Sequence, residues 1–186
     1  MKKTASLFLV LILATALLAG CGGNPVKAAT DALEKSGLRS AFFSRPDMPD
    51  YLSPEYDIGD PLPDIKVSTP IYRIEYDDSG SGRFTSASAE GGKFTDADAM
   101  TKGTLVFMVS RDHSTKVYND KKGNTFRGDQ ESLRVYLYDI DSRQFFGEKT
   151  FYGEPLENSY SNYRGPALFV NRADRKEVEA WIDTFR

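Results

Sequence analysis

Hydrophobic and polar residues alternate along the middle of the chain in short runs that are typical of β-strands. The runs are rich in β-branched and aromatic residues, and polar or glycine-containing breaks separate them. Two breaks, 119–124 and 139–143, are short enough to join neighbouring strands as turns. The pattern predicts six strands, over residues 71–76, 104–109, 115–118, 133–138, 148–152 and 167–170.

Both ends of this region have the features of short amphipathic helices. Residues 24–38 start with Asn24 as a cap and Pro25 in the first turn, and Gly37 provides a stop. Asp174 caps a second helix, in which apolar residues follow an i, i+3, i+4, i+7 spacing. They are Val178, Trp181, Ile182 and Phe185. Because the helices lie at the ends, we predict an α+β fold, an antiparallel β-sheet with an N-terminal and a C-terminal helix packed on it.

Two segments interrupt the strand pattern. Residues 79–103 are dominated by Gly, Ser, Ala and Thr, and we expect a mobile surface connection there. Residues 46–70 form an acidic arm, with six of the nine prolines and six carboxylates against Lys66, so a regular helix or a central strand is excluded. Its apolar residues, such as Ile65 and Val67, favour an ordered strap on the domain. The alternative is a docking arm for a basic surface or a cation, although its carboxylates lack the spacing of a calcium loop.

The N-terminus has the proportions of a secretory leader. Lys2 and Lys3 precede an uncharged run of 13 residues, 7–19. As a helix this run reaches only about 20 Å, whereas the hydrocarbon core of a bilayer is about 30 Å thick. The run is therefore too short for a permanent transmembrane span.

The leader ends in Leu18, Ala19, Gly20 and Cys21, and Cys21 is the only cysteine of the chain. Here the sequence resembles bacterial lipoprotein precursors, whose lipobox these four residues match. The resemblance implies that diacylglycerol is joined to the Cys21 sulfur, and that the chain is cut between Gly20 and Cys21. It covers the leader alone. The alternative is an ordinary secreted protein with a stray cysteine.

Removal of the signal peptide 1–20 leaves 166 residues, a length suited to one domain with a sizeable core. We predict a short lipidated tether at 21–23 and a single α+β domain at 24–186. One cysteine permits no internal disulfide, so packing has to stabilise the domain. Acidic residues outnumber basic ones 27 to 24, which argues against nucleic acid as a partner.

Templates for catalysis and for metal binding find little support. A Ser-His-Asp mechanism would need His113, the only histidine, which is expected to be solvated in a turn between two strands. One histidine and one lipidated cysteine make a zinc site improbable. Gly92-Lys93 lacks the remaining residues of a phosphate-binding loop. We therefore predict no cofactor, no metal and no catalytic residue.

A tyrosine-rich segment near the C-terminus is the candidate binding loop. Tyr160, Asn162, Tyr163 and Arg164 combine rigid aromatic area with adaptable hydrogen-bonding groups, which is typical of recognition loops. The competing interpretation is a long loop whose tyrosines fold back on the sheet. Together with the leader, this segment predicts an extracytoplasmic binding module of the cell envelope. Acylated Cys21 would anchor it to the cell membrane or the outer membrane, and its partner would be an envelope protein. The alternative is a carboxylate-dependent hydrolase of cell-wall glycan, because paired acids are sufficient for that chemistry.

Overall fold

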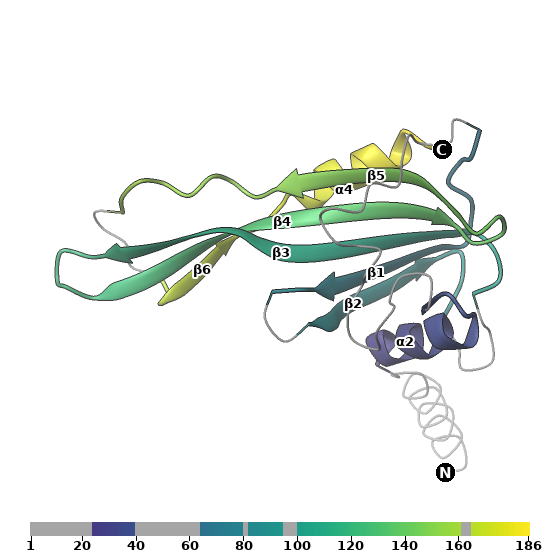
Figure 1. Ribbon diagram of the computed structural model, residues 1–186, viewed down its shortest axis with the longest axis horizontal. Helices are drawn as coiled ribbons and strands as arrows, with labels where there is room; N and C mark the ends of the chain where they lie inside the picture. The colour runs from purple at the N-terminus through teal and green to yellow at the C-terminus, as the bar shows by residue number, and fades with distance from the viewer. Residues whose placement is uncertain (1–23, 40–63, 80–81, 95–99, 161–164) are drawn as a thin grey trace, which may run out of the picture.

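The computed structural model describes residues 24–39, 64–79, 82–94, 100–160 and 165–186. Within these residues, six strands form one sheet, and helices α2 and α4 lie beside it (Figure 1). The elements in chain order are α2 (Pro25–Lys35), β1 (Ile71–Asp77), β2 (Arg83–Glu90), β3 (Thr104–Asn119), β4 (Thr125–Asp139), β5 (Gln144–Tyr152), β6 (Leu168–Asn171) and α4 (Arg175–Asp183). None of the described helices is long and apolar enough to cross a membrane.

The sheet is mixed, so the prediction of an antiparallel sheet is wrong. The strand order is β2-β1-β3-β4-β5. β6 also pairs with β4, at residues 127–130, whereas β5 pairs with residues 132–139 of that strand. β1 runs parallel to β3, and β4 runs parallel to β6, while the other pairs are antiparallel. The reason is the placement of β2 on the outer edge of β1. After β2, the chain therefore crosses β1 to reach the position of β3. β3 then runs in the same direction as β1.

β2 lies inside the segment 79–103 that was expected to be a mobile connection. Its residues alternate between partly buried and exposed positions, and Phe84, Ala87 and Ala89 pack against the core. Small Ser and Ala residues occupy half of the strand, so its composition resembles that of a loop. Pairing with β1 over its whole length, rather than intrinsic β-propensity, makes this segment a strand.

The predicted strands 104–109 and 115–118 are parts of the single strand β3. A β-bulge between Asp112 and Ser114 interrupts its pairing with β4. His113 lies at this bulge rather than in a turn, is exposed, and its ring lies 4.6 Å from the ring of Tyr152. A strand of 16 residues spans about 50 Å at ~3.3 Å per residue. The β3–β4 hairpin therefore extends beyond the part of the sheet that the helices cover (Figure 1).

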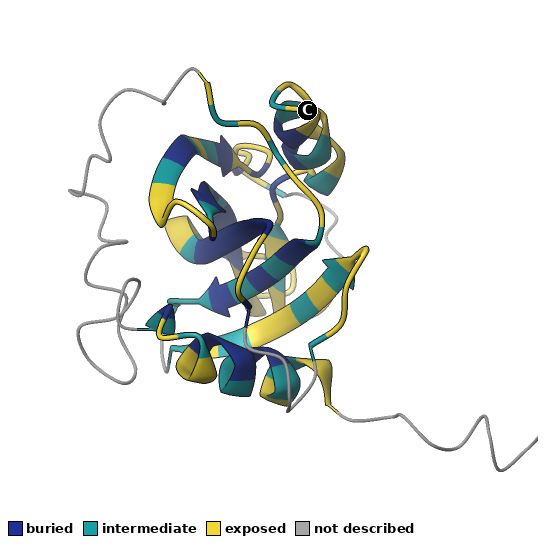
Figure 2. Cartoon of the chain, turned by 90° about the vertical axis from the view of Figure 1, so that its right-hand side faces the viewer, coloured by how far each residue is buried: buried dark blue, intermediate teal, exposed yellow. Residues whose placement is uncertain are grey.

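Each side of the sheet carries its own hydrophobic cluster. On one side, Ala29, Ala32 and Leu33 of α2 pack with side chains such as Phe107 and Tyr136. Figure 2 shows α2 and α4 on opposite sides of the sheet, with the buried side of α2 turned inward. As the sequence predicted, Asn24 caps α2 by accepting a hydrogen bond from the Val26 N–H at 3.0 Å.

α4 covers the second side of the sheet. The four apolar residues of the predicted helix, Val178, Trp181, Ile182 and Phe185, all join this cluster. Asp174 is the N-cap, as predicted, and accepts from the Lys176 N–H at 2.8 Å.

Only the last residues of the acidic arm lie among the described residues, and 46–63 lie outside them. Ile65 and Val67 pack against the α4-side cluster. The Val67 N–H also donates to the Phe185 carbonyl at 2.9 Å. Residues 64–70 therefore have the contacts expected of a strap on the domain.

Candidate functional site

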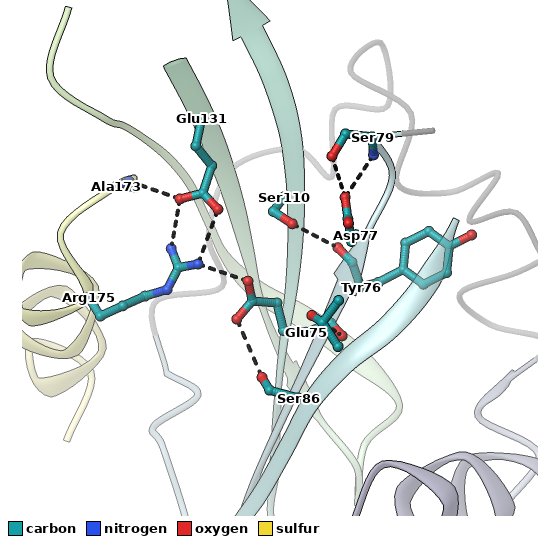
Figure 3. Close-up of polar contacts among 10 residues, drawn as sticks. Glu75, Tyr76, Asp77, Ser79, Ser86, Ser110, Glu131, Ala173 and Arg175 are labelled. Carbon is teal, nitrogen blue, oxygen red and sulfur yellow. Dashed lines mark hydrogen bonds and ion pairs between the residues drawn. The ribbon is translucent and has the colours of Figure 1, made fainter. Parts of the chain in front are cut away.

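A polar pocket lies on the α4 side of the sheet, beside the N-terminus of α4. Its volume is about 180 Å³. β1, β3 and β4 contribute to its lining, together with the end of β6 and the link to α4. Figure 3 shows Glu75 of β1 and Glu131 of β4 pointing toward Arg175, and Asp77 of β1 pointing toward Ser79. The charged and hydroxyl groups of the lining include Glu75, Asp77, Ser110, Asp112, Glu131 and Arg172.

Arg175, the first residue of α4, joins two of the pocket carboxylates. Its Nη2 lies 2.8 Å from Glu75 Oε1 and 3.3 Å from Glu131 Oε1. Glu131 is buried, and its Oε2 also accepts from the Ala173 N–H at 2.9 Å. A buried carboxylate requires such partners, because an unpaired charge in the interior is very costly. Glu75 and Glu131 therefore hold the start of α4 against β1 and β4 (Figure 3).

Asp77 and Asp112 also line the pocket and are less completely paired. Asp77 Oδ1 accepts from the N–H of Ser79 at 2.9 Å and from its hydroxyl group. Asp112 lies 3.2 Å from Arg127 Nη2. Partial burial nevertheless raises the pKa of Asp112, and the negative charge of Asp129 adds to the increase. Arg127 does not offset these effects, because it is shared with Asp129, whose Oδ1 lies 2.6 Å from Arg127 Nε.

Asp112→Asn is expected to stabilise the protein slightly at neutral pH. Because the pKa of Asp112 is raised in the folded state, its ionised form opposes folding above that pKa. The opposition disappears as the pH falls through the folded pKa toward the ordinary aspartate value. The variant should melt about 1 °C above wild type at pH 7 and at the same temperature near pH 3. A variant that melts below wild type at pH 7 would mean that the ion pair with Arg127 dominates.

The second candidate surface is the hairpin end, which we define as residues 112–131 of β3 and β4 together with β6. One of its two sides carries four aromatic rings. Tyr160 packs edge-on against Tyr118 at 4.9 Å and against Phe169 at 5.3 Å, and Phe126 stacks on Tyr118 at 5.2 Å. The ring of Phe169 crosses over Gly128, where a Cβ atom would lie 2.4 Å from it. A glycine inside a strand is a sequence signal of such a close approach, so Gly128 could have indicated this contact in advance.

The segment before Tyr160 is fixed to the same side of the hairpin end. Lys116 Nζ donates to the Leu156 carbonyl at 2.9 Å, and the Tyr118 hydroxyl donates to the Glu157 carbonyl at 2.8 Å. Tyr160 thus folds back on the sheet, as the competing interpretation of the binding loop stated. The other predicted site residues, Asn162, Tyr163, Arg164, Gly20 and Cys21, lie outside the described residues.

The opposite side of the hairpin end, which faces the same way as α4, has exposed aliphatic side chains. Val117 lies across from Arg127, which in turn lies beside Leu168, and Asp129 lies beside Val170. The exposed fractions are 66% for Val117, 50% for Leu168 and 40% for Val170. Among the described residues, three of the four exposed large hydrophobic side chains lie here, and the fourth is Tyr152 at the end of β5. We call Val117, Leu168 and Val170 the aliphatic patch.

The aliphatic patch and the polar pocket meet at Val170, which belongs to both. They therefore form one continuous surface on the α4 side. No local pattern in the sequence indicates this surface, because Glu75, Glu131 and Arg175 come from segments far apart in the chain.

Comparisons with known proteins identify no relative. No family model, no curated protein and no solved structure matches this chain. Within the described residues, no three His, Cys, Asp or Glu side chains are arranged to hold a metal ion.

Proposed function

We propose that this protein is a lipid-anchored, non-enzymatic binding module of the cell envelope. It contacts a protein partner through the aliphatic patch of the hairpin end. Anchoring rests on the lipobox sequence and on acylation of Cys21. Only residues 22 and 23 separate this cysteine from Asn24, the cap of α2. A link of three residues reaches about 10 Å, so the domain sits close to the bilayer.

The distribution of exposed hydrophobic side chains carries the proposal of a binding function. Single exposed hydrophobic residues are common on protein surfaces, but their concentration in one region is typical of interaction sites. Here they gather where the sheet extends beyond both helices (Figure 1). α2, which follows the anchor, lies at the other end of the sheet from the hairpin tip. The anchor and the patch are therefore separated along the long axis of the molecule.

Photo-crosslinking in intact cells tests this function. A benzoylphenylalanine at Val117 should give a discrete adduct with an envelope protein. The same group at Lys27, an exposed residue of α2, is the matched control and should not give that adduct. Adding Leu168→Asp to the Val117 probe should reduce the adduct at least fivefold, because a carboxylate would enter the apolar contact. Identical adducts at both positions, or none at either, would contradict the proposal.

The alternative function is a hydrolase of cell-wall glycan. One observation favours it, because Asp112 has a raised pKa and lines the same pocket as Asp77. Glycosidases need an acid that stays protonated and a second carboxylate. The pocket volume of about 180 Å³ is below the ~300–1,000 Å³ of typical ligand sites, so binding remains the better-supported function. If the protein hydrolyses cell-wall fragments and Asp112→Asn abolishes this activity, the hydrolase would become the better-supported function.

A further inference from the structure

Among the described residues, no strand covers the outer edge of β6. β6 pairs with β4 on one side, and no other described strand pairs with it. Backbone N–H and C=O groups at a sheet edge are strong hydrogen-bonding groups, and an exposed edge is a template for another strand.

The register determines which backbone groups of β6 face outward. The Arg127 N–H donates to the Ala167 carbonyl at 2.8 Å, and Arg127 lies beside Leu168. In a parallel ladder, the residues before and after Leu168 then bond to β4, and the backbone groups of Leu168 itself point away. The same holds for Val170, which lies beside Asp129. Two N–H and two C=O groups therefore line the open edge.

The side chains of these two residues make the edge suitable for a specific partner. Leu168 and Val170 belong to the aliphatic patch, so backbone groups and exposed apolar side chains occur at the same positions. Recognition by strand addition combines these two features, since the backbone bonds give affinity and alternate side chains give specificity. The strand is only four residues long, which limits unspecific pairing between edges.

Arg172 adds an electrostatic preference at the end of the edge. It follows β6 directly and is exposed. No described residue forms a hydrogen bond or ion pair with its guanidinium, whereas Arg127 and Arg175 are both engaged by carboxylates. An acidic side chain of a partner is the complementary group.

We propose that an extended segment of the partner protein adds to β6 as a further strand, bonding to the backbone of Leu168 and Val170. The segment has apolar residues at alternate positions, which contact Leu168 and Val170 of the aliphatic patch, and an acidic residue beside Arg172. The inference rests on the proposed binding function and specifies how the partner is recognised.

Peptide binding to the full chain in detergent tests this inference. The probe is a panel of fluorescent nine-residue peptides that alternate Val or Ile with Thr and end in Asp, measured by anisotropy. A copy of the best binder, N-methylated at alternate residues on the bonding edge, should bind roughly tenfold more weakly, because its backbone can no longer donate. Exchange of Asp for Lys should also weaken binding, and Arg172→Ala should abolish that difference.

Val170→Pro is the matching change in the protein. Proline removes the outward N–H of Val170 while leaving the bonds between β6 and β4 in place, as edge strands allow. Val170→Thr is the control, because it keeps the N–H and the branched side chain. We expect a loss of about five- to tenfold for proline and less than threefold for threonine. Unchanged circular dichroism has to accompany the proline result, and the N-methylated peptide tests the same bonds where the variant does not fold.

Three outcomes would overturn strand addition. The first is that no peptide binds at 1 mM. The second is that Val170→Pro and Val170→Thr change peptide binding equally and N-methylation of the peptide does not change it. The third is that the chain sediments as a dimer in which β6 pairs with a second copy instead. The proposed function fails separately. An adduct at Val117 that is insensitive to Val170→Pro leaves the binding module in place and removes only its strand-addition mode.

Discussion

Replacing Cys21 with serine should move nearly all of the protein from the detergent-rich phase to the aqueous phase in a partitioning experiment. The lipobox interpretation places a diacylglycerol on the Cys21 sulfur, and serine has no thiol to receive it. Each buried methylene contributes ~0.8 kcal/mol, and two chains give stable anchoring where one gives only reversible binding. The expected shift is therefore almost complete.

Two measurements separate loss of the anchor from loss of the fold. Gly22→Ser is the matched control, because it alters the neighbouring residue and keeps the sulfur, and it should stay in the detergent-rich phase. The melting temperature of Cys21→Ser should equal that of the wild type, since Cys21 precedes the first described residue of the domain. Mass spectrometry of the native protein showing an unmodified thiol or an uncut leader would contradict the prediction.

In the proposed lipoprotein, the short tether determines how the hairpin end is presented. A domain held within about 10 Å of the bilayer has little freedom to reorient, in contrast to one on a long flexible linker. With α2 next to the proposed anchor, the 16 residues of β3 place Val117 far along the molecule. The patch is thus presented at a distance from the anchor that the sheet itself determines. A rigid sheet suits a module that engages a second envelope protein.

Both helices could be predicted from the sequence because their signals are local. Asn24 and Asp174 cap the helices by bonding to backbone N–H groups two residues away. The apolar spacing that includes Val178 and Ile182 indicates one buried face. Each signal lies within a few residues of the element that it defines. Such patterns survive in a single sequence.

The arrangement of the sheet could not be predicted because it depends on distant partners. The parallel pairing of Ile71 with Thr104 is determined only once β2 has occupied the far edge of β1. The bulge at His113 makes one strand look like two, since it shifts the alternation of inward and outward residues. Apolar periodicity finds strands, but it does not show which strands pair.

The candidate site follows the same rule. The composition of its segment predicted Tyr160 as a binding residue. In the structure, however, its ring packs against Tyr118 and Phe169. The aliphatic patch was missed because Val117 and Leu168 look like ordinary strand residues in the sequence. They are exposed because α4 begins after β6 and runs away from the hairpin end, so it does not cover this part of the sheet (Figure 1). Exposure of this kind depends on tertiary structure.

Gly153→Ala is expected to cost about 3 kcal/mol of unfolding free energy, because the new methyl group would collide with backbone. A Cβ atom at Gly153 would lie 1.8 Å from the carbonyl oxygen of Asn171, the last residue of β6. Gly153 has little room to retreat. Its N–H donates to the Glu131 carbonyl at 2.9 Å, and its own carbonyl accepts from Gln130 Nε2 at 2.8 Å. β6 is therefore the element that must move.

The displacement should have both a global and a local signature. A loss of about 3 kcal/mol lowers the melting temperature by roughly 6–12 °C in a chain of this size. Amide hydrogen exchange should accelerate most at β6 and at the residues of β4 that pair with it, while α2 stays protected. Glu154→Ala is the control, because that exposed residue keeps the carbonyl that accepts from Asn171 Nδ2. If both variants melt alike, the junction of β5 and β6 does not hold the edge strand in place, and the open edge loses its fixed position.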